Sequence, residues 1–174
     1  MKITDVLCLS GNLHGIGALR DPDAFVFVNI NDVMKKVFPT AQILLRFALG
    51  VGFLLPVLDR IGFLGAPGSA DVSWGNWNNF VGYANSLMPY FSPKTASLFG
   101  VIATIAEASL GILLIIGYQV KLAAYGSFIL TLAFALSMLF FVGYRSPFDY
   151  SVFVVSFSSL LLASLQNKET RKHE

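Results

Sequence analysis

Charged residues are scarce in this sequence. Only 13% of its 174 residues are Asp, Glu, Lys or Arg, against roughly 25% in a soluble domain. Hydrophobic residues make up 55% of the chain, and the mean hydropathy is +0.68. A soluble globule of this size could not hide so much apolar surface. The sequence does not have the low hydrophobicity of a disordered chain, so disorder is excluded. It also has no cluster of Lys and Arg, which excludes a nucleic-acid-binding protein. The composition therefore predicts a membrane protein.

Cysteine and histidine are nearly absent as well. Cys8 is the single cysteine, which excludes an intramolecular disulfide, a paired-cysteine redox motif and a thiolate metal cluster. The two histidines, His14 and His173, lie far apart and outside the apolar segments. We therefore expect no metal site built from His and Cys.

Long apolar runs, in contrast, are abundant. Each has about the ~20 residues that a helix needs to cross ~30 Å of hydrocarbon, although the last is short. They are continuously apolar, whereas the strands of a membrane barrel alternate. The sequence thus predicts an all-α fold, a four-helix transmembrane bundle whose spans are Ala41–Leu64, Thr95–Gly117, Leu122–Val142 and Tyr150–Leu165.

Positive charges outside these spans predict the orientation, since Lys and Arg concentrate on the cytoplasmic side. One side would hold Lys2, Arg20, Lys35, Lys36, Lys121, Lys168, Arg171 and Lys172, and the other Arg60, Lys94 and Arg145. We therefore expect a multi-pass protein of the bacterial inner membrane with both termini cytoplasmic, and a first span that is an uncleaved signal anchor.

Three parts of the chain follow from these boundaries. Residues 1–38 are too polar to span and form a cytoplasmic N-terminal extension, in which 24–30 has the composition of a short strand. Residues 39–166 form the membrane domain. Residues 167–174 form a cytoplasmic tail.

The loop between the first two spans contains an amphipathic stretch. Ser73 is the expected N-cap of a helix there. Two interpretations are open: its tryptophans anchor the protein at headgroup depth, or the helix lies in the outer interface as a lid over a cavity between the spans. The stripe at helical spacing consists of Trp74, Trp77, Val81, Ala84, Leu87 and Phe91.

Arg46 and Glu107 are charges inside the predicted spans. A lone charge near the bilayer centre costs at least ~2.5–3.5 kcal/mol, so such residues usually pair or line a cavity. At 1.5 Å per residue, Arg46 lies roughly 7.5 Å deep and Glu107 roughly 15 Å deep, within reach of a long side chain. Three interpretations remain: an ion pair that only fixes helix register, an Arg46 that snorkels beside a protonated Glu107, or a polar site in the bundle core.

A second polar cluster is expected at the outer face. Asp59 and Arg60 end the first span, and Arg145, Asp149 and Tyr150 connect the last two spans. They are either ordinary interfacial residues or, if they converge under the tryptophan helix, a polar vestibule open to the periplasm.

Taken in order, several short motifs resemble the DoxX-like family of integral membrane proteins. The resemblance covers about residues 40 to 165, and the ordered set is more specific than any one motif. The motifs are Arg46–Gly50, Phe53–Arg60, Trp74–Trp77, Ala106–Glu107 with Leu110–Gly111, and Ser146–Ser151.

The resemblance implies a four-helix membrane bundle and candidate site residues, but no single activity. One branch of the family is a subunit of thiosulfate:quinone oxidoreductase, and other members are linked to oxidative or quinone stress. A quinone-linked redox component would rely on membrane quinone and a second redox subunit or periplasmic partner, because the sequence contains no ligand set for an intrinsic cofactor. The alternative is a non-enzymatic module that binds a lipid, small ligand or partner protein. The residues that match the motifs are Arg46, Asp59, Arg60, Glu107, Asp149 and Tyr150.

Overall fold

The structure, a computed structural model, describes the backbone of residues 30–170 and the side chains of residues 37–166. The chain divides into two units, Met1–Met34 and Lys35–Glu174. All contacts below belong to the second unit. The strand expected at 24–30 lies outside the described residues except for Ile30, which begins a helix, and Cys8, His14 and His173 lie outside them too.

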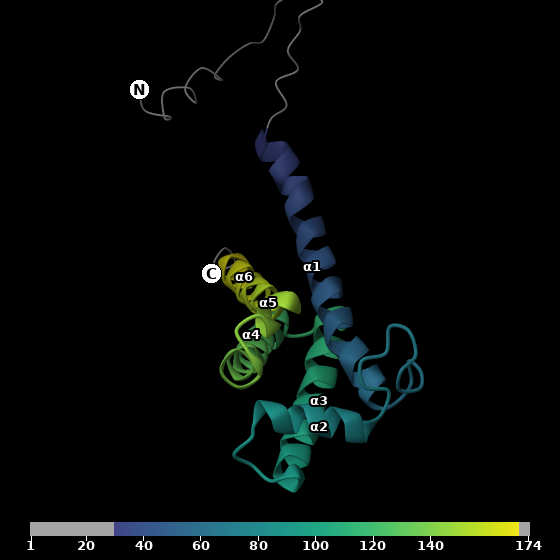
Figure 1. Ribbon diagram of the computed structural model, residues 1–174. Helices are drawn as coiled ribbons and strands as arrows, with labels where there is room; N and C mark the ends of the chain where they lie inside the picture. Colours follow the sequence, from purple (N-terminus) through teal and green to yellow (C-terminus); the bar gives the residue numbers. More distant parts are fainter. Residues whose placement is uncertain (1–29, 171–174) are drawn as a thin grey trace, which may run out of the picture. The chain divides into compact units, whose positions relative to one another are not determined.

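The described part of the chain contains helices, turns and loops but no strand. Figure 1 shows long helices joined by short connections, apart from one longer loop after the first helix. The elements are α1 (Ile30–Arg60), α2 (Trp77–Leu87), α3 (Pro93–Ile116), α4 (Val120–Ser137), the π-helix η2 (Met138–Val142), α5 (Ser146–Asp149) and α6 (Val152–Thr170).

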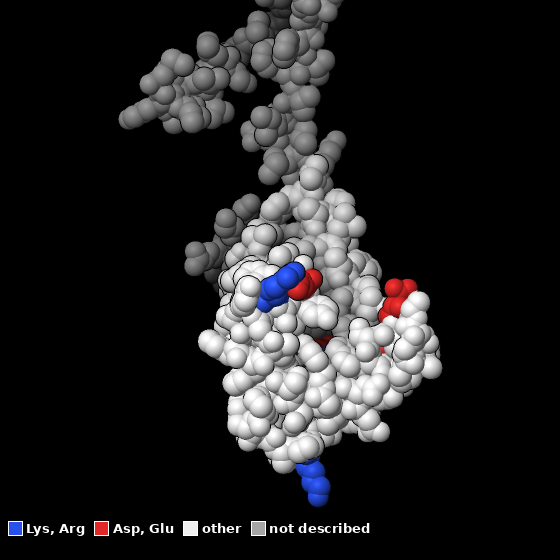
Figure 2. All heavy atoms as spheres, viewed as in Figure 1, with Lys and Arg blue, Asp and Glu red and all other residues white. Residues whose placement is uncertain are grey.

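Three helical segments of the described chain are long and apolar enough to cross a membrane: Val37–Arg60, Pro93–Ile116 and Val120–Val142. They correspond to the first three predicted spans. The fourth predicted span is a shorter apolar helix, Val152–Gln166. The face drawn in Figure 2 has few charged side chains in its described part, as contact with lipid requires.

Helix α3 has well-defined ends. Ser92 caps its start by accepting a hydrogen bond from the Thr95 amide, and Pro93 occupies the first turn, where a missing N–H costs nothing. At the other end, Gly117 adopts the left-handed conformation (φ 82°) that closes a helix. The chain therefore turns back at once into α4.

Small residues allow close helix packing. A Cβ atom on Gly50 of α1 would lie 2.9 Å from the carbonyl oxygen of Gly111 on α3, and one on Gly111 would lie 3.0 Å from the Gly50 oxygen. Helices α4 and α6 also pack together, around Ala123, Ala124 and Ala163, which are buried. The Gly50–Gly111 crossing brings the polar side chains of α1 close to α3.

Helix α2 is shorter than the predicted amphipathic helix. Its N-cap is Asn76, whose side chain accepts a hydrogen bond from the Asn79 amide, so the expectation of Ser73 as N-cap is wrong. Gly75, between Ser73 and Asn76, adopts a left-handed conformation (φ 64°), so the helix does not extend back to Ser73. Trp74 consequently precedes the helix and Trp77 begins it. The helix packs across α3.

Candidate functional site

Two of the buried charged residues in the described chain form an ion pair. Arg60 is the last residue of α1, Glu107 lies in the middle of α3, and each is 4% exposed. The guanidinium meets the carboxylate with both terminal nitrogens: Nη1 lies 2.6 Å from Oε2, and Nη2 donates a hydrogen bond to Oε1 at 3.1 Å. Two parallel contacts of this kind fix the geometry as well as the charge.

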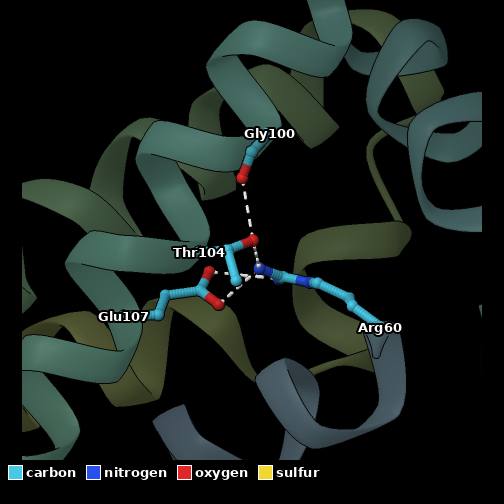
Figure 3. Close-up of polar contacts among 4 residues, drawn as sticks. All are labelled: Arg60, Gly100, Thr104 and Glu107. Atoms are coloured by element: carbon cyan, nitrogen blue, oxygen red, sulfur yellow. Dashed lines mark hydrogen bonds and ion pairs between the residues drawn. The ribbon is translucent and has the colours of Figure 1, made fainter. Parts of the chain in front are cut away.

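The hydroxyl group of Thr104 also hydrogen-bonds to Arg60 of this pair. Arg60 Nη1 donates to Thr104 Oγ1 at 3.0 Å, and Thr104 Oγ1 donates to the carbonyl oxygen of Gly100 at 2.8 Å. Figure 3 shows the arginine reaching from α1 toward Thr104 and Glu107, which project from one side of α3. They share that side because residues three apart are neighbours on a helix surface.

Aromatic rings cover the guanidinium. The Phe80 ring centroid lies 4.1 Å from Arg60 Cζ, and the Trp74 centroid lies 5.3 Å from it. Both distances are within the ~6 Å range of cation–π attraction. Gly100 makes the approach possible, because a Cβ atom there would lie only 2.9 Å from Phe80 Cε1. Trp74 and Phe80 thus cover Arg60, and Trp77 packs on Phe80; we call these three residues the aromatic lid.

Asp59 holds the loop that carries Trp74. Its carboxylate, 4% exposed, accepts hydrogen bonds from three successive backbone amides: Ser73 at 3.1 Å, Trp74 at 3.0 Å and Gly75 at 3.0 Å. Such a carboxylate is well satisfied without a basic side chain. Asp59 therefore positions the lid, while its neighbour Arg60 lies beneath it.

Of the three interpretations of Arg46 and Glu107, the ion pair between them is wrong. Arg46 Nε instead donates to the carbonyl oxygen of Leu114 at 3.1 Å, and its guanidinium lies against Gly117 at the end of α3. There it meets the unpaired carbonyls and the negative end of the helix dipole. The Gly50–Gly111 crossing sets an antiparallel register that places Arg46 about two turns from Glu107.

The expected outer cluster divides into two groups. Asp59 and Arg60 are buried, whereas Arg145 and Asp149 form an exposed pair at 3.9 Å with side chains 77% and 59% exposed. Among the described side chains, no hydrogen bond or ion pair joins the two groups. Tyr150 is exposed.

Tyr150 nevertheless affects the pKa of Tyr83, a residue of α2. Burial raises the pKa of the Tyr83 phenol above its usual value, and repulsion from Tyr150 raises it further. Tyr83 packs against Trp74, with ring centroids 5.8 Å apart. The phenol therefore stays neutral beside the aromatic lid at physiological pH.

An open hollow of about 210 Å³ adjoins the pair. It is lined by Trp77, Val101, Thr104 and Ile105, so the threonine that accepts from Arg60 is also part of its wall. Buried polar atoms remain close by: Arg60 Nε has no hydrogen-bond partner, and Glu107 Oε2 is held by the ion pair alone. An unsatisfied buried group costs roughly 1–3 kcal/mol.

Sequence reasoning had not selected Thr104 or Phe80 as site residues. Thr104 lies one turn before Glu107 on the same small-residue face, which is a usable signal. Phe80 lies one turn after Trp77, but nothing in the sequence indicates that its ring faces an arginine.

In the part of the chain that the structure describes, no group of three or more His, Cys, Asp or Glu side chains could hold a metal ion. Comparison with protein-family models, curated proteins and solved structures found no match for the chain.

Proposed function

We propose that this chain is a DoxX-like four-helix membrane protein of the bacterial inner membrane, with a quinone-linked redox role. The observation that carries the proposal is the buried Arg60–Glu107 pair beneath the aromatic lid and beside an open hollow. In this arrangement α6 is the fourth span, and both termini are cytoplasmic.

The chemistry of the pair suits a quinone ring. Reduction of a quinone carbonyl places negative charge on its oxygen, and the Arg60 guanidinium, which Glu107 neutralises before reduction, would stabilise that oxygen as a hydrogen-bond donor. Glu107 is a carboxyl group that can deliver or accept the accompanying proton. Electrons would come from a second redox subunit or a periplasmic donor.

The test is quinone binding and thiosulfate-dependent quinone reduction by the protein, with its partner subunit where one co-purifies, in lipid nanodiscs. Glu107→Gln keeps the shape of the side chain but cannot exchange protons, so we expect reduction to fall by about 10²–10⁴-fold, the usual contribution of a positioned acid–base group. Asp71→Asn is the matched control, because that carboxylate is exposed and lies outside the candidate site. Wild-type protein that binds no quinone would refute the proposal.

The second candidate function is a non-enzymatic module that binds a lipid or another small apolar ligand. The observation in its favour is the apolar character of the hollow, where Trp77, Val101 and Ile105 accompany a single threonine. Mass spectrometry of the protein extracted with its native lipids separates the two: a bound lipid without quinone binding favours the module.

A further inference from the structure

We infer that the hollow beside Thr104 admits the ligand directly from the bilayer and holds the first part of its apolar tail, while an uncharged hydrogen-bond acceptor at its head meets Arg60. The inference rests on the proposed function and adds the route, the tail subsite and the residues that select the tail, Val101 and Ile105.

The side on which the hollow opens indicates the source of the ligand. Val101 and Ile105 line it and are themselves exposed, and their neighbours Leu98 and Ile102 on α3 are exposed apolar residues too. A membrane-length helix with such a face contacts lipid rather than water. A ligand that enters here comes from the bilayer.

The size of the hollow indicates how much of the ligand it holds. Pockets that enclose a drug-sized ligand measure roughly 300–1,000 Å³, and this one measures about 210 Å³. It can therefore hold one segment of a long molecule, with the remainder of the tail lying in the lipid. Its apolar walls suit a hydrocarbon segment.

The electrostatics of the pair indicate an uncharged head. Glu107 already neutralises Arg60, so an anionic head would compete with a carboxylate that has few other partners inside the protein. A carbonyl oxygen adds a hydrogen bond to the guanidinium without displacing that charge. Arg60 Nε, buried and unpartnered, is a donor for it.

Thr104 connects the tail subsite to the head subsite. Its hydroxyl lies in the wall of the hollow and 3.0 Å from Arg60 Nη1. Thr104 thus both lines the hollow and contacts the guanidinium. Trp77, in the same wall, packs on Phe80 with ring centroids 5.2 Å apart, and Phe80 covers Arg60.

The experiment compares two benzoquinones with the same ring, one with a long alkyl chain and one without, bound to the full-length protein in nanodiscs. Ile105→Trp fills the hollow. Because Ile105 is 62% exposed, the larger side chain can be accommodated and the variant should still fold. Ile102→Trp adds the same indole to a neighbouring exposed position outside the hollow and is the matched control. Val101→Phe provides a second filling variant.

We expect Ile105→Trp to weaken binding of the chain-bearing quinone by roughly tenfold, which corresponds to about two methylene groups no longer buried. The chainless quinone should bind within about twofold of wild type, and Ile102→Trp should change neither. If both filling variants weaken the two quinones equally, or weaken neither, the tail subsite is wrong while the proposed function stands. If wild-type protein binds neither quinone, both fail.

Discussion

At the scale of single residues, two arginines of α1 have separate tasks. Arg60 pairs with a buried carboxylate, whereas Arg46 caps the C-terminal end of α3. The sequence singled out Arg46 as a charge inside an apolar segment, where charges are costly, and placed Arg60 in a polar cluster at the outer end of the first span. Their partners were not predictable, because the partner depends on the register set where Gly50 crosses Gly111.

A double-mutant cycle tests the pairing of Arg60 with Glu107. Removing one partner leaves the other buried and unpaired, so Glu107→Gln and Arg60→Gln should each cost about 3–5 kcal/mol of unfolding free energy. The double variant should recover part of this loss, because no lone charge remains. Thermal or denaturant unfolding in nanodiscs measures the effect.

The control cycle combines Arg46→Gln with Glu107→Gln. These side chains do not touch, so their effects should add within about 0.3–0.5 kcal/mol. Additive effects for Arg60 and Glu107, together with coupling for Arg46 and Glu107, would contradict the register described above.

Asp59 offers a second test at this scale. Asp59→Ala removes the acceptor of three amide hydrogen bonds, and bonds to a charged acceptor contribute about 1.5–3 kcal/mol each, part of which water restores. We expect hydrogen exchange at Ser73, Trp74 and Gly75 to accelerate at least about 30-fold, the equivalent of roughly 2 kcal/mol. Asp71→Asn, at an exposed position, should leave the exchange unchanged.

At the scale of elements, the membrane-length helices were more predictable from the sequence than the start of α2, which carries part of the aromatic lid. Continuous apolar runs located α3 and α4 to within a few residues, since a membrane helix must be apolar along its length. The start of α2 was misplaced because a serine and an asparagine are both good N-caps, and the left-handed turn at Gly75 decided between them.

Two glycine substitutions test how the lid helix is seated. Gly100→Ala places a methyl group 2.9 Å from Phe80 Cε1 and should push α2 away from α3. We expect a loss of about 1–3 kcal/mol of stability, as for other overpacked sites. Quenchers at headgroup depth should also reach Trp74 and Trp77 more readily.

Gly82→Ala on α2 is the matched control. No atom lies within 4 Å of the new methyl group, so the helix should gain roughly 0.5–1 kcal/mol from the better helix former. An equal loss of stability in both variants would mean that Gly100 does not define the seat of the lid.

At the scale of the whole molecule, the number of spans determines on which side the chain ends. Three segments meet the length and composition of a membrane helix, and α6 is shorter and apolar. If α6 also spans, as proposed, the termini share one side of the membrane. If it does not, they lie on opposite sides.

Reporter fusions and cysteine labelling decide between these topologies. We expect a reporter fused after Lys172 to be active only as a cytoplasmic fusion, and one inserted in Gly65–Ser73 only as a periplasmic one. An impermeant maleimide should reach Cys8, the native cysteine, only after permeabilisation. Labelling of Cys8 in intact cells, with a cytoplasmic reporter after Lys172, would contradict the four-span arrangement.

The adjacency of Asp59 and Arg60 has a mechanical consequence. Asp59 accepts hydrogen bonds from the loop and Arg60 binds Glu107, and both residues belong to the final turn of α1. A displacement of that turn strains both attachments together, so the loop and the ion pair are thermodynamically linked. Linkage is reciprocal: the free energy by which breaking the pair weakens the attachment of the loop equals the free energy by which releasing the loop weakens the pair. A fluorophore on the loop would thus report, from outside the membrane, the state of a carboxylate buried within it.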